Sequence, residues 1–421
     1  MLLILKVRGP KLTNIRNYIV VTAAYWGFTL TDGALRMLVL LHFHTLGYSP
    51  FELAVLFLLY ELMGIVTNLI GGWLGSRFGV KLTLLTGLAL QILSLFLLSC
   101  LNPLWSAIFS LVFVLFAQGL SGVAKDLSKM SSKSAIKFVV PQNNHSTLFK
   151  LVALLTGSKN ALKGVGFFLG GVLLSVFGFV YALWIMAAAL FIVLVLSGWL
   201  LPSSMGKAST KAKIKEIFSK SKPINILSTA RIFLFGARDV WFVVALPVFL
   251  LSELNWGFEE VGGCLALWII GYGLVQSLAP SLVKSSADGH SKELKYASAW
   301  MVILCLVTLA IAIVIEVQFF IPSSLLFGLA IFGFCFAVNS ALHSYLILNF
   351  SNVDDVALSV GFYYSANAAG RLLGTLMSGV AYQTAGLTGA LVVALSMLII
   401  ATVFTMLLGP ASNHEKNHQV Q

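Results

Sequence analysis

The chain has 421 residues, of which 59% are hydrophobic and only 10% charged, and its formal net charge is +12. Soluble domains carry about 25% charged residues, so this composition excludes a water-soluble core and indicates a chain that folds in lipid. The apolar runs are long and continuous rather than short and alternating, which predicts membrane helices and excludes a β-barrel.

Apolar stretches long enough to cross a bilayer follow one another along the whole chain. They fall near residues 17–41, 51–75, 82–101, 104–124, 149–177, 180–201, 225–251, 260–283, 296–316, 320–349, 357–385 and 387–409. The longest polar stretch, residues 202–223, is rich in lysine and follows the sixth span. We therefore expect an all-α membrane protein with an N-terminal six-helix half (1–201), a cytoplasmic linker (202–223) and a C-terminal six-helix half (224–421).

Basic residues occur only in alternate connections between these spans. The N-terminal tail and the second, fourth, central and eighth connections carry Lys or Arg, whereas the odd-numbered connections carry glutamates instead. By the positive-inside rule, both termini and the central linker face the cytoplasm of a bacterial inner membrane. This topology accounts for the surplus positive charge, so no nucleic-acid partner is expected.

The two halves share polar residues at a constant spacing. Asp32 and Asp239 lie 207 residues apart, each near the middle of the first helix of its half, and Asn160 and Asn367 have the same separation in the fifth and eleventh spans. A common offset predicts an internal duplication. Two six-helix halves with a site between them are typical of secondary transporters.

The connection between the second and third spans, residues 72–81, reads GWLGSRFGVK. It resembles the cytoplasmic loop signature of the major facilitator superfamily, whose arginine, here Arg77, is implied to pair across the domain interface as a gating group. Ser76 stands where the signature has an acid, and Val80 stands where it has a base. The match therefore supports the fold more strongly than it supports a particular gating ion pair.

Charged residues inside apolar spans are candidates for function, because each costs about 2.5–3.5 kcal/mol at mid-membrane on insertion scales. The cations outnumber the anions, so a cavity built from them would favour an anionic small-molecule substrate. The cations are Arg36, Lys159, Lys163, Arg231, Arg238 and Arg371, and the anions are Asp32, Glu61 and Asp239. We expect the six cations, with Asn160 and Asn367, to bind the substrate.

Spacing along the helices groups these charges. Lys159 and Lys163 are separated by four residues and share one helix face, and Arg231 and Arg238, seven apart, share another. Arg238 and Asp239 are adjacent, so we expect their side chains to point in different directions. In the superfamily that the loop resembles, the first and fifth helices of each half line the central cavity.

Structural pairing remains an alternative for several of these groups. Asp32 and Arg36 are four residues apart and could neutralise each other, and Asp239 could pair with a cation from another helix. Arg231 could extend to the cytoplasmic surface. We assign Asp32, Asp239 and Glu61 to coupling or gating, with Asp32 as the candidate proton carrier and Glu61 as an interdomain pair.

A polar helix continues from the fourth span, with Lys125, Lys129 and Lys133 recurring every four residues. One interpretation is a cytoplasmic entry path that draws anions towards the cavity. The alternative is that these lysines extend to anionic lipid headgroups.

Four longer segments carry a more specific resemblance. Residues 16–36 (RNYIVVTAAYWGFTLTDGALR), 41–53 (LHFHTLGYSPFEL), 122–137 (GVAKDLSKMSSKSAIK) and 155–166 (LTGSKNALKGVG) resemble organoarsenical efflux permeases of arsenic-resistance operons, the ArsJ type. The resemblance covers about residues 14–410. It implies export of 1-arseno-3-phosphoglycerate, made by a partner glyceraldehyde-3-phosphate dehydrogenase from arsenate, and hence arsenate resistance.

The four cysteines are scattered, which does not suit trivalent arsenic because that ion favours clustered thiolates. A proton-coupled exporter of another anionic metabolite or drug remains an alternative, as does a membrane receptor or regulator on a transporter fold. We expect a monomer that is not an enzyme and that has no cofactor and no metal site.

Overall fold

The computed structural model describes residues 12–102, 104–136, 145–202, 205, 221–282, 291–351 and 356–419. Throughout these ranges the regular structure is helical, and no strand occurs in them. The helices are α2 (Leu12–Thr45), α3 (Pro50–Leu56), α4 (Leu58–Ser99), α5 (Ala107–Ile136), α6 (His145–Leu200), α7 (Lys222–Phe242), α8 (Ala245–Ser252), α9 (Phe258–Leu282), α10 (Ser291–Glu316), α11 (Ser323–Phe350) and α12 (Val356–Gln419). The predicted all-α class is confirmed.

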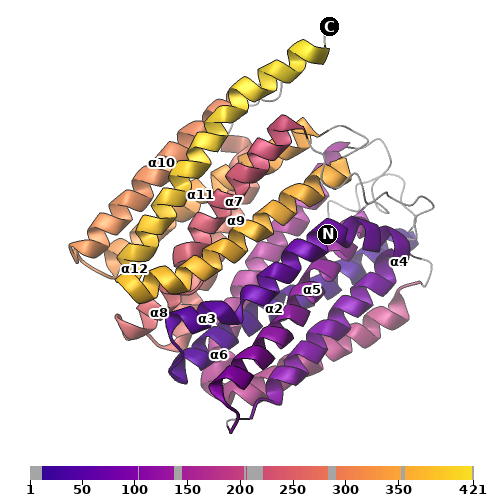
Figure 1. The fold of residues 1–421 in the computed structure, drawn as a ribbon. Coiled ribbons are helices and arrows are strands. Elements are labelled where there is room, and N and C mark those ends of the chain that lie inside the picture. The colour runs from indigo at the N-terminus through magenta and orange to yellow at the C-terminus, as the bar shows by residue number, and fades with distance from the viewer. Residues whose placement is uncertain are drawn as a thin grey trace.

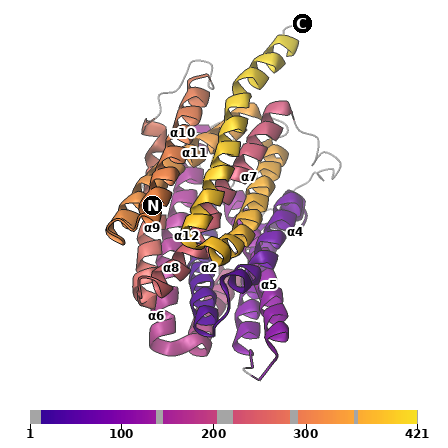
Figure 2. The same cartoon turned by 60° about the vertical axis from the view of Figure 1, so that its left-hand side comes forward.

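Three long helices are interrupted by glycines with positive φ, a conformation that side chains other than glycine rarely adopt. Gly79 (φ 79°) divides α4, Gly178 (φ 72°) divides α6, and Gly386 (φ 61°) divides α12. At Gly178 and Gly386 the chain folds back on itself, as the turns of α6 and α12 in Figure 2 show. The predicted span limits at 177–180 and 385–387 fall at these two glycines.

With these divisions, the described residues contain the twelve predicted membrane-crossing segments. Nine stretches of the described residues are long and apolar enough to cross a membrane, and two of them, Leu154–Leu200 and Ser359–Gly409, are the helices divided at Gly178 and Gly386. The nine stretches thus contain eleven crossings, and helix α2 is the twelfth. Helix α2 is not among the nine because its polar residues lower its hydropathy. The α3 helix with the first part of α4 makes the second span, and α7 with α8 makes the seventh.

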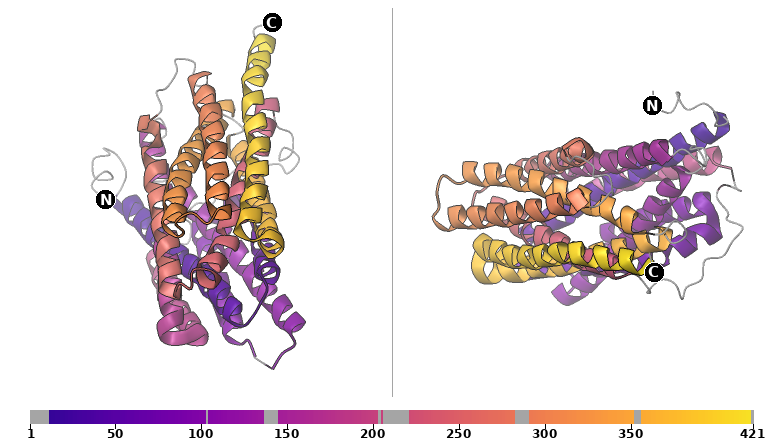
Figure 3. Two further views of the ribbon diagram at one scale, coloured as in Figure 1. Left: turned by 90° about the vertical axis from the view of Figure 1, so that its left-hand side faces the viewer. Right: turned by 90° about the horizontal axis from the view of Figure 1, so that it is seen from above.

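The first half of the chain lies beside the second half (Figure 1). Across this division, α3 and the first part of α4 pack against α12, and α6 packs against α9. Figure 3 shows from two further directions that the long helices run side by side. The second and eleventh spans, and the fifth and eighth spans, therefore join the halves and enclose the space between them.

The basic loop after the second span has a partly structural role. Lys81 Nζ donates hydrogen bonds to the carbonyl oxygens of Gly198 (2.8 Å) and Leu201 (2.6 Å), which closes the C-terminal end of the sixth span. The side chain of Arg77 lies outside the described part of the structure, so its gating role stays a prediction. Most of the predicted linker 202–223 also lies outside the described residues.

Candidate functional site

A cavity of about 230 Å³ lies between the two halves. Its walls come from α2 and α6 of the first half and from α7 and α12 of the second, with further residues from α4, α5, α9 and α11. All eight predicted substrate-binding residues line it: Arg36, Lys159, Asn160, Lys163, Arg231, Arg238, Asn367 and Arg371. The first and fifth helices of each half therefore supply much of the cavity lining, as the resemblance to the superfamily implied.

The lining is strongly cationic. Its described residues include nine cationic side chains but only three carboxylates, those of Asp32, Asp126 and Asp239. The three lysines predicted to form an entry path, Lys125, Lys129 and Lys133, are part of the same lining. Their side chains face the cavity, so the alternative of extension to lipid headgroups is wrong for these three.

A chain of ion pairs crosses from one half to the other at the cavity wall. Glu61 is fully buried, and its Oε1 accepts from Arg36 Nη1 (3.0 Å) and from Arg371 Nη2 (2.6 Å). Arg371 Nε also donates to Asp239 Oδ2 (3.2 Å), and Asp239 Oδ1 lies 2.5 Å from Arg238 Nη2. Glu61 thus forms the predicted interdomain pair, and Asp239 pairs with a cation from another helix.

One of the alternatives left open for neighbouring charges is wrong, and so is one expectation. Arg36 turns to Glu61 on α4, and Asp32 instead accepts a hydrogen bond from the Tyr60 hydroxyl (2.7 Å), so Asp32 and Arg36 do not neutralise each other. Arg238 and its neighbour Asp239 do not point apart but form an ion pair. The long arginine side chain folds back along the helix to reach the adjacent carboxylate.

Arg231 stays inside the protein rather than extending to the surface. Its side chain is buried, its Nε donates to Asn367 Oδ1 (3.0 Å) and its Nη1 donates to the Ser340 carbonyl (3.2 Å). The guanidinium also lies 3.8 Å from the centroid of the Phe235 ring. Because all three partners are neutral, the amide, the carbonyl and the aromatic ring stabilise the positive charge of Arg231 without neutralising it.

On α5, Asp126, which the sequence pattern did not single out, pairs with two of the entry lysines, and its Oδ2 lies 4.0 Å from Lys125 Nζ. Asp126 is fully buried, and its Oδ1 accepts from Lys129 Nζ at 2.9 Å. Lys133 instead lies 4.3 Å from the centroid of the Tyr364 ring. Asp126 could have been found from the sequence, because it is the one acid in the lysine-rich run 125–133. Tyr60 and Tyr364 could not have been found in the same way, because a search for charged residues in apolar spans does not select tyrosines.

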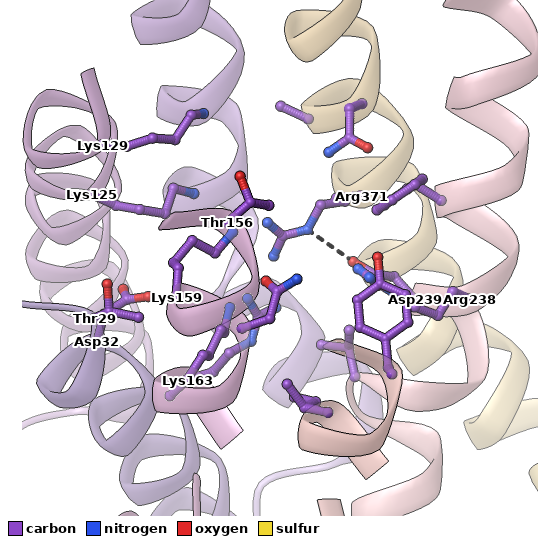
Figure 4. A pocket seen from close by; sticks show the side chains of 18 of the residues that line it. Thr29, Asp32, Lys125, Lys129, Thr156, Lys159, Lys163, Arg238, Asp239 and Arg371 are labelled. Carbon is purple, nitrogen blue, oxygen red and sulfur yellow. Dashed lines mark hydrogen bonds and ion pairs between the residues drawn. The ribbon is translucent and has the colours of Figure 1, made fainter. Parts of the chain in front are cut away.

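Lys159 and Lys163 differ from the other cations of the cavity. Neither has an ion pair or a hydrogen-bond partner within the part of the chain that the structure describes. Figure 4 shows both side chains projecting from α6 into the space between the lysines of α5 and Arg371 of α12. The Lys163 ammonium lies 5.7 Å from the centroid of the Phe167 ring. These two ammonium groups are therefore free to bind a ligand.

Comparisons with known proteins agree with this architecture. A family model described as the Major Facilitator Superfamily matches residues 18–285 and 227–421. A solved structure from a study of substrate recognition in proton dependent oligopeptide transporters is similar in fold, with a TM-score of 0.70 and 14% sequence identity over 95% of this chain and 99% of that chain. A search of curated protein sequences gave no match.

Proposed function

The chain belongs to the Major Facilitator Superfamily, whose members are secondary transporters, and on that premise we propose that it exports a small organic anion by alternating access. One observation carries this proposal. Lys159 and Lys163 face the cavity between the halves without any carboxylate partner among the described residues. A ligand that supplies negative charge offsets the cost of keeping these cations away from bulk water.

The same geometry suggests how binding is linked to movement of the halves. Arg371 lines the cavity and also holds Glu61 of the first half and Asp239 of the second. An anion that draws the Arg371 guanidinium towards itself weakens these pairs, which changes the contact between the halves. We accordingly propose a gating role for Glu61 and Asp239, and we retain Asp32 as the candidate proton carrier.

We further propose that the exported anion is 1-arseno-3-phosphoglycerate and that the protein confers arsenate resistance from a bacterial inner membrane. This assignment rests on the resemblance of residues 16–36, 41–53, 122–137 and 155–166 to organoarsenical efflux permeases. The cationic cavity supports it, because the ester carries an arsenate and a phosphate group. A glyceraldehyde-3-phosphate dehydrogenase would supply the substrate. An exporter of another anionic metabolite or drug is the competing assignment.

Growth of an arsenic-sensitive bacterium tests the substrate. Cells receive this gene alone, the dehydrogenase gene alone, or both, and are grown on arsenate or on arsenite. We expect protection against arsenate that requires both genes, and no protection against arsenite. Equal protection against arsenite, or arsenate protection that is independent of the dehydrogenase, would contradict the organoarsenical assignment. A Lys163→Gln chain that reaches the membrane should give no protection.

A further inference from the structure

Tyr60 lies in the first turn of α4, where the second span resumes after the break at Phe57. Its side chain is buried, and its hydroxyl donates to Asp32 Oδ1 at 2.7 Å. Its main chain is held by α5, because Gly122 crosses directly over it, and a Cβ added at Gly122 would clash with the Tyr60 carbonyl oxygen. The ring therefore has a fixed position between Asp32 of α2 and the glycine of α5.

The face of the Tyr60 ring carries a cation. Lys125 Nζ lies 4.0 Å from the ring centroid, and Arg36 Cζ lies further away, at 5.6 Å. Lys125 stands three residues after Gly122, so the helix crossing that fixes the tyrosine also places the ammonium group over its ring. An aromatic ring attracts a cation through its quadrupole but does not neutralise it. Lys125 is thus held against the ring of Tyr60 rather than against the carboxylate of Asp32.

Asp32 has no ion pair among the described residues, although the cations Lys125 and Lys163 lie near it. In Figure 4, Lys125 and Asp32 come from neighbouring helices on the same side of the cavity. Arg36 is held by Glu61. The titratable and charged groups around Asp32 and Tyr60 are Tyr25 and Arg36 of α2, Glu61 of α4, Lys125 and Asp126 of α5, Lys163 of α6 and Arg371 of α12.

The second half of the chain lacks this arrangement. Trp268 stands 208 residues after Tyr60, and its indole Nε1 donates to a backbone carbonyl of α11 at 2.7 Å. Asp239, the aspartate of that half, is held instead by Arg238 and Arg371. The tyrosine therefore occurs beside the aspartate that has no arginine partner, which points to a role in keeping that carboxylate unpaired.

We propose that Tyr60 is a positioning residue for the coupling aspartate: its hydroxyl holds the Asp32 carboxylate, and its ring keeps the Lys125 ammonium from pairing with it. The inference rests on the coupling role proposed for Asp32 and adds the group that leaves this carboxylate able to exchange a proton. A hydrogen bond donated to a carboxylate favours its ionised form, and so does an opposite charge within about 4–6 Å. The hydroxyl of Tyr60 therefore favours ionised Asp32, whereas the ring opposes it by excluding Lys125.

Infrared spectra of the purified full-length protein in detergent test this without any substrate. A protonated carboxyl group has a carbonyl stretching band that a carboxylate lacks. The part of this band that disappears in Asp32→Asn belongs to Asp32. The measured quantity is the midpoint, the pH at which half of that part has appeared.

Two substitutions separate the hydroxyl from the ring. Tyr60→Phe removes only the hydroxyl, so the midpoint should rise by about one pH unit. Tyr60→Leu also removes the ring, so Lys125 can reach Asp32, and the midpoint should lie about one pH unit or more below that of Tyr60→Phe. Addition of Lys125→Gln to both variants should abolish the difference between them.

Controls show that these shifts are specific. Tyr18→Phe, at a buried tyrosine of α2 that does not line the cavity, should leave the midpoint unchanged. Melting temperatures show whether each variant is folded. Tyr60→Met repeats the test of the ring with a flexible side chain if Tyr60→Leu does not fold.

The outcomes separate this inference from the role on which it rests. An unchanged midpoint in Tyr60→Phe would overturn the role of the hydroxyl. Equal midpoints in Tyr60→Phe and Tyr60→Leu, or a difference that persists with Lys125→Gln, would overturn the role of the ring. Each of these results leaves the coupling role of Asp32 in place. If Asp32→Asn removes no band at any pH, Asp32 takes up no proton, and both the coupling role and this inference are wrong.

Discussion

Replacement of Glu61 by glutamine tests the ion-pair chain that joins the two halves. Glu61 is fully buried and accepts hydrogen bonds from Arg36 and Arg371 through one oxygen. Arg371 keeps Asp239 as a partner in the variant, but Arg36 has no other ion pair among the described residues. Removing one member of a buried pair costs about 3–5 kcal/mol, because the remaining charge stays buried without compensation. We expect Glu61→Gln to lose stability in that range and to lose transport.

A double-mutant cycle measures how much of this loss belongs to the pair with Arg36. Thermal unfolding of Glu61→Gln, Arg36→Gln and the double variant is followed in detergent, with Glu259→Gln as a control at an exposed acid outside the cavity. Contacting residues show coupling energies of about 0.5–3 kcal/mol, so the double variant should be destabilised by less than the sum of the two single variants. Strictly additive effects would refute the ion pair as a source of stability.

Three further predictions concern binding, coupling and orientation. Lys163→Gln should reach the membrane and melt normally yet lose transport. Arg371→Gln should lose both stability and transport, because the link between the halves is broken and Glu61 and Asp239 each keep only one arginine partner. Asp32→Asn should remove the dependence of transport on a proton gradient but not ligand binding; an unchanged gradient dependence would make Asp32 structural. A reporter fused after Met205 should be found in the cytoplasm, and a reporter fused at Asn255 should be found in the periplasm. A cytoplasmic reporter at Asn255 would contradict the predicted topology.

The positions of the helices could be predicted because lipid requires long apolar segments. Three of the breaks between spans fall at glycines, at Gly79, Gly178 and Gly386. Gly178 and Gly386 sit at predicted span limits, where a positive φ allows the chain to fold back. The cavity cations were also predictable, since a charge in an apolar span is too costly to occur without a role.

The partners of those charges could not be predicted from the sequence. Spacing along one helix allowed Asp32 as the partner of Arg36, but in the structure Arg36 pairs with Glu61 of another helix. Contacts between helices depend on how each helix is rotated, and a sequence pattern does not specify this. Tyr60, which donates to Asp32, was missed for a related reason, because an aromatic residue in an apolar span usually fills a core.

The matched positions of the two halves have taken different roles. Lys163 and Arg371, 208 residues apart, stand at corresponding places in the fifth and eleventh spans. Lys163 has no ion pair among the described residues, whereas Arg371 holds two carboxylates. Asp32 and Asp239 differ in the same way, because one accepts from a tyrosine and the other from two arginines. A planar guanidinium suits fixed pairs that hold the halves together, and a compact ammonium suits a ligand that must later leave. At these two pairs of positions, the first half therefore has the residue without an ion pair among the described residues, and the second half has the residue held in ion pairs.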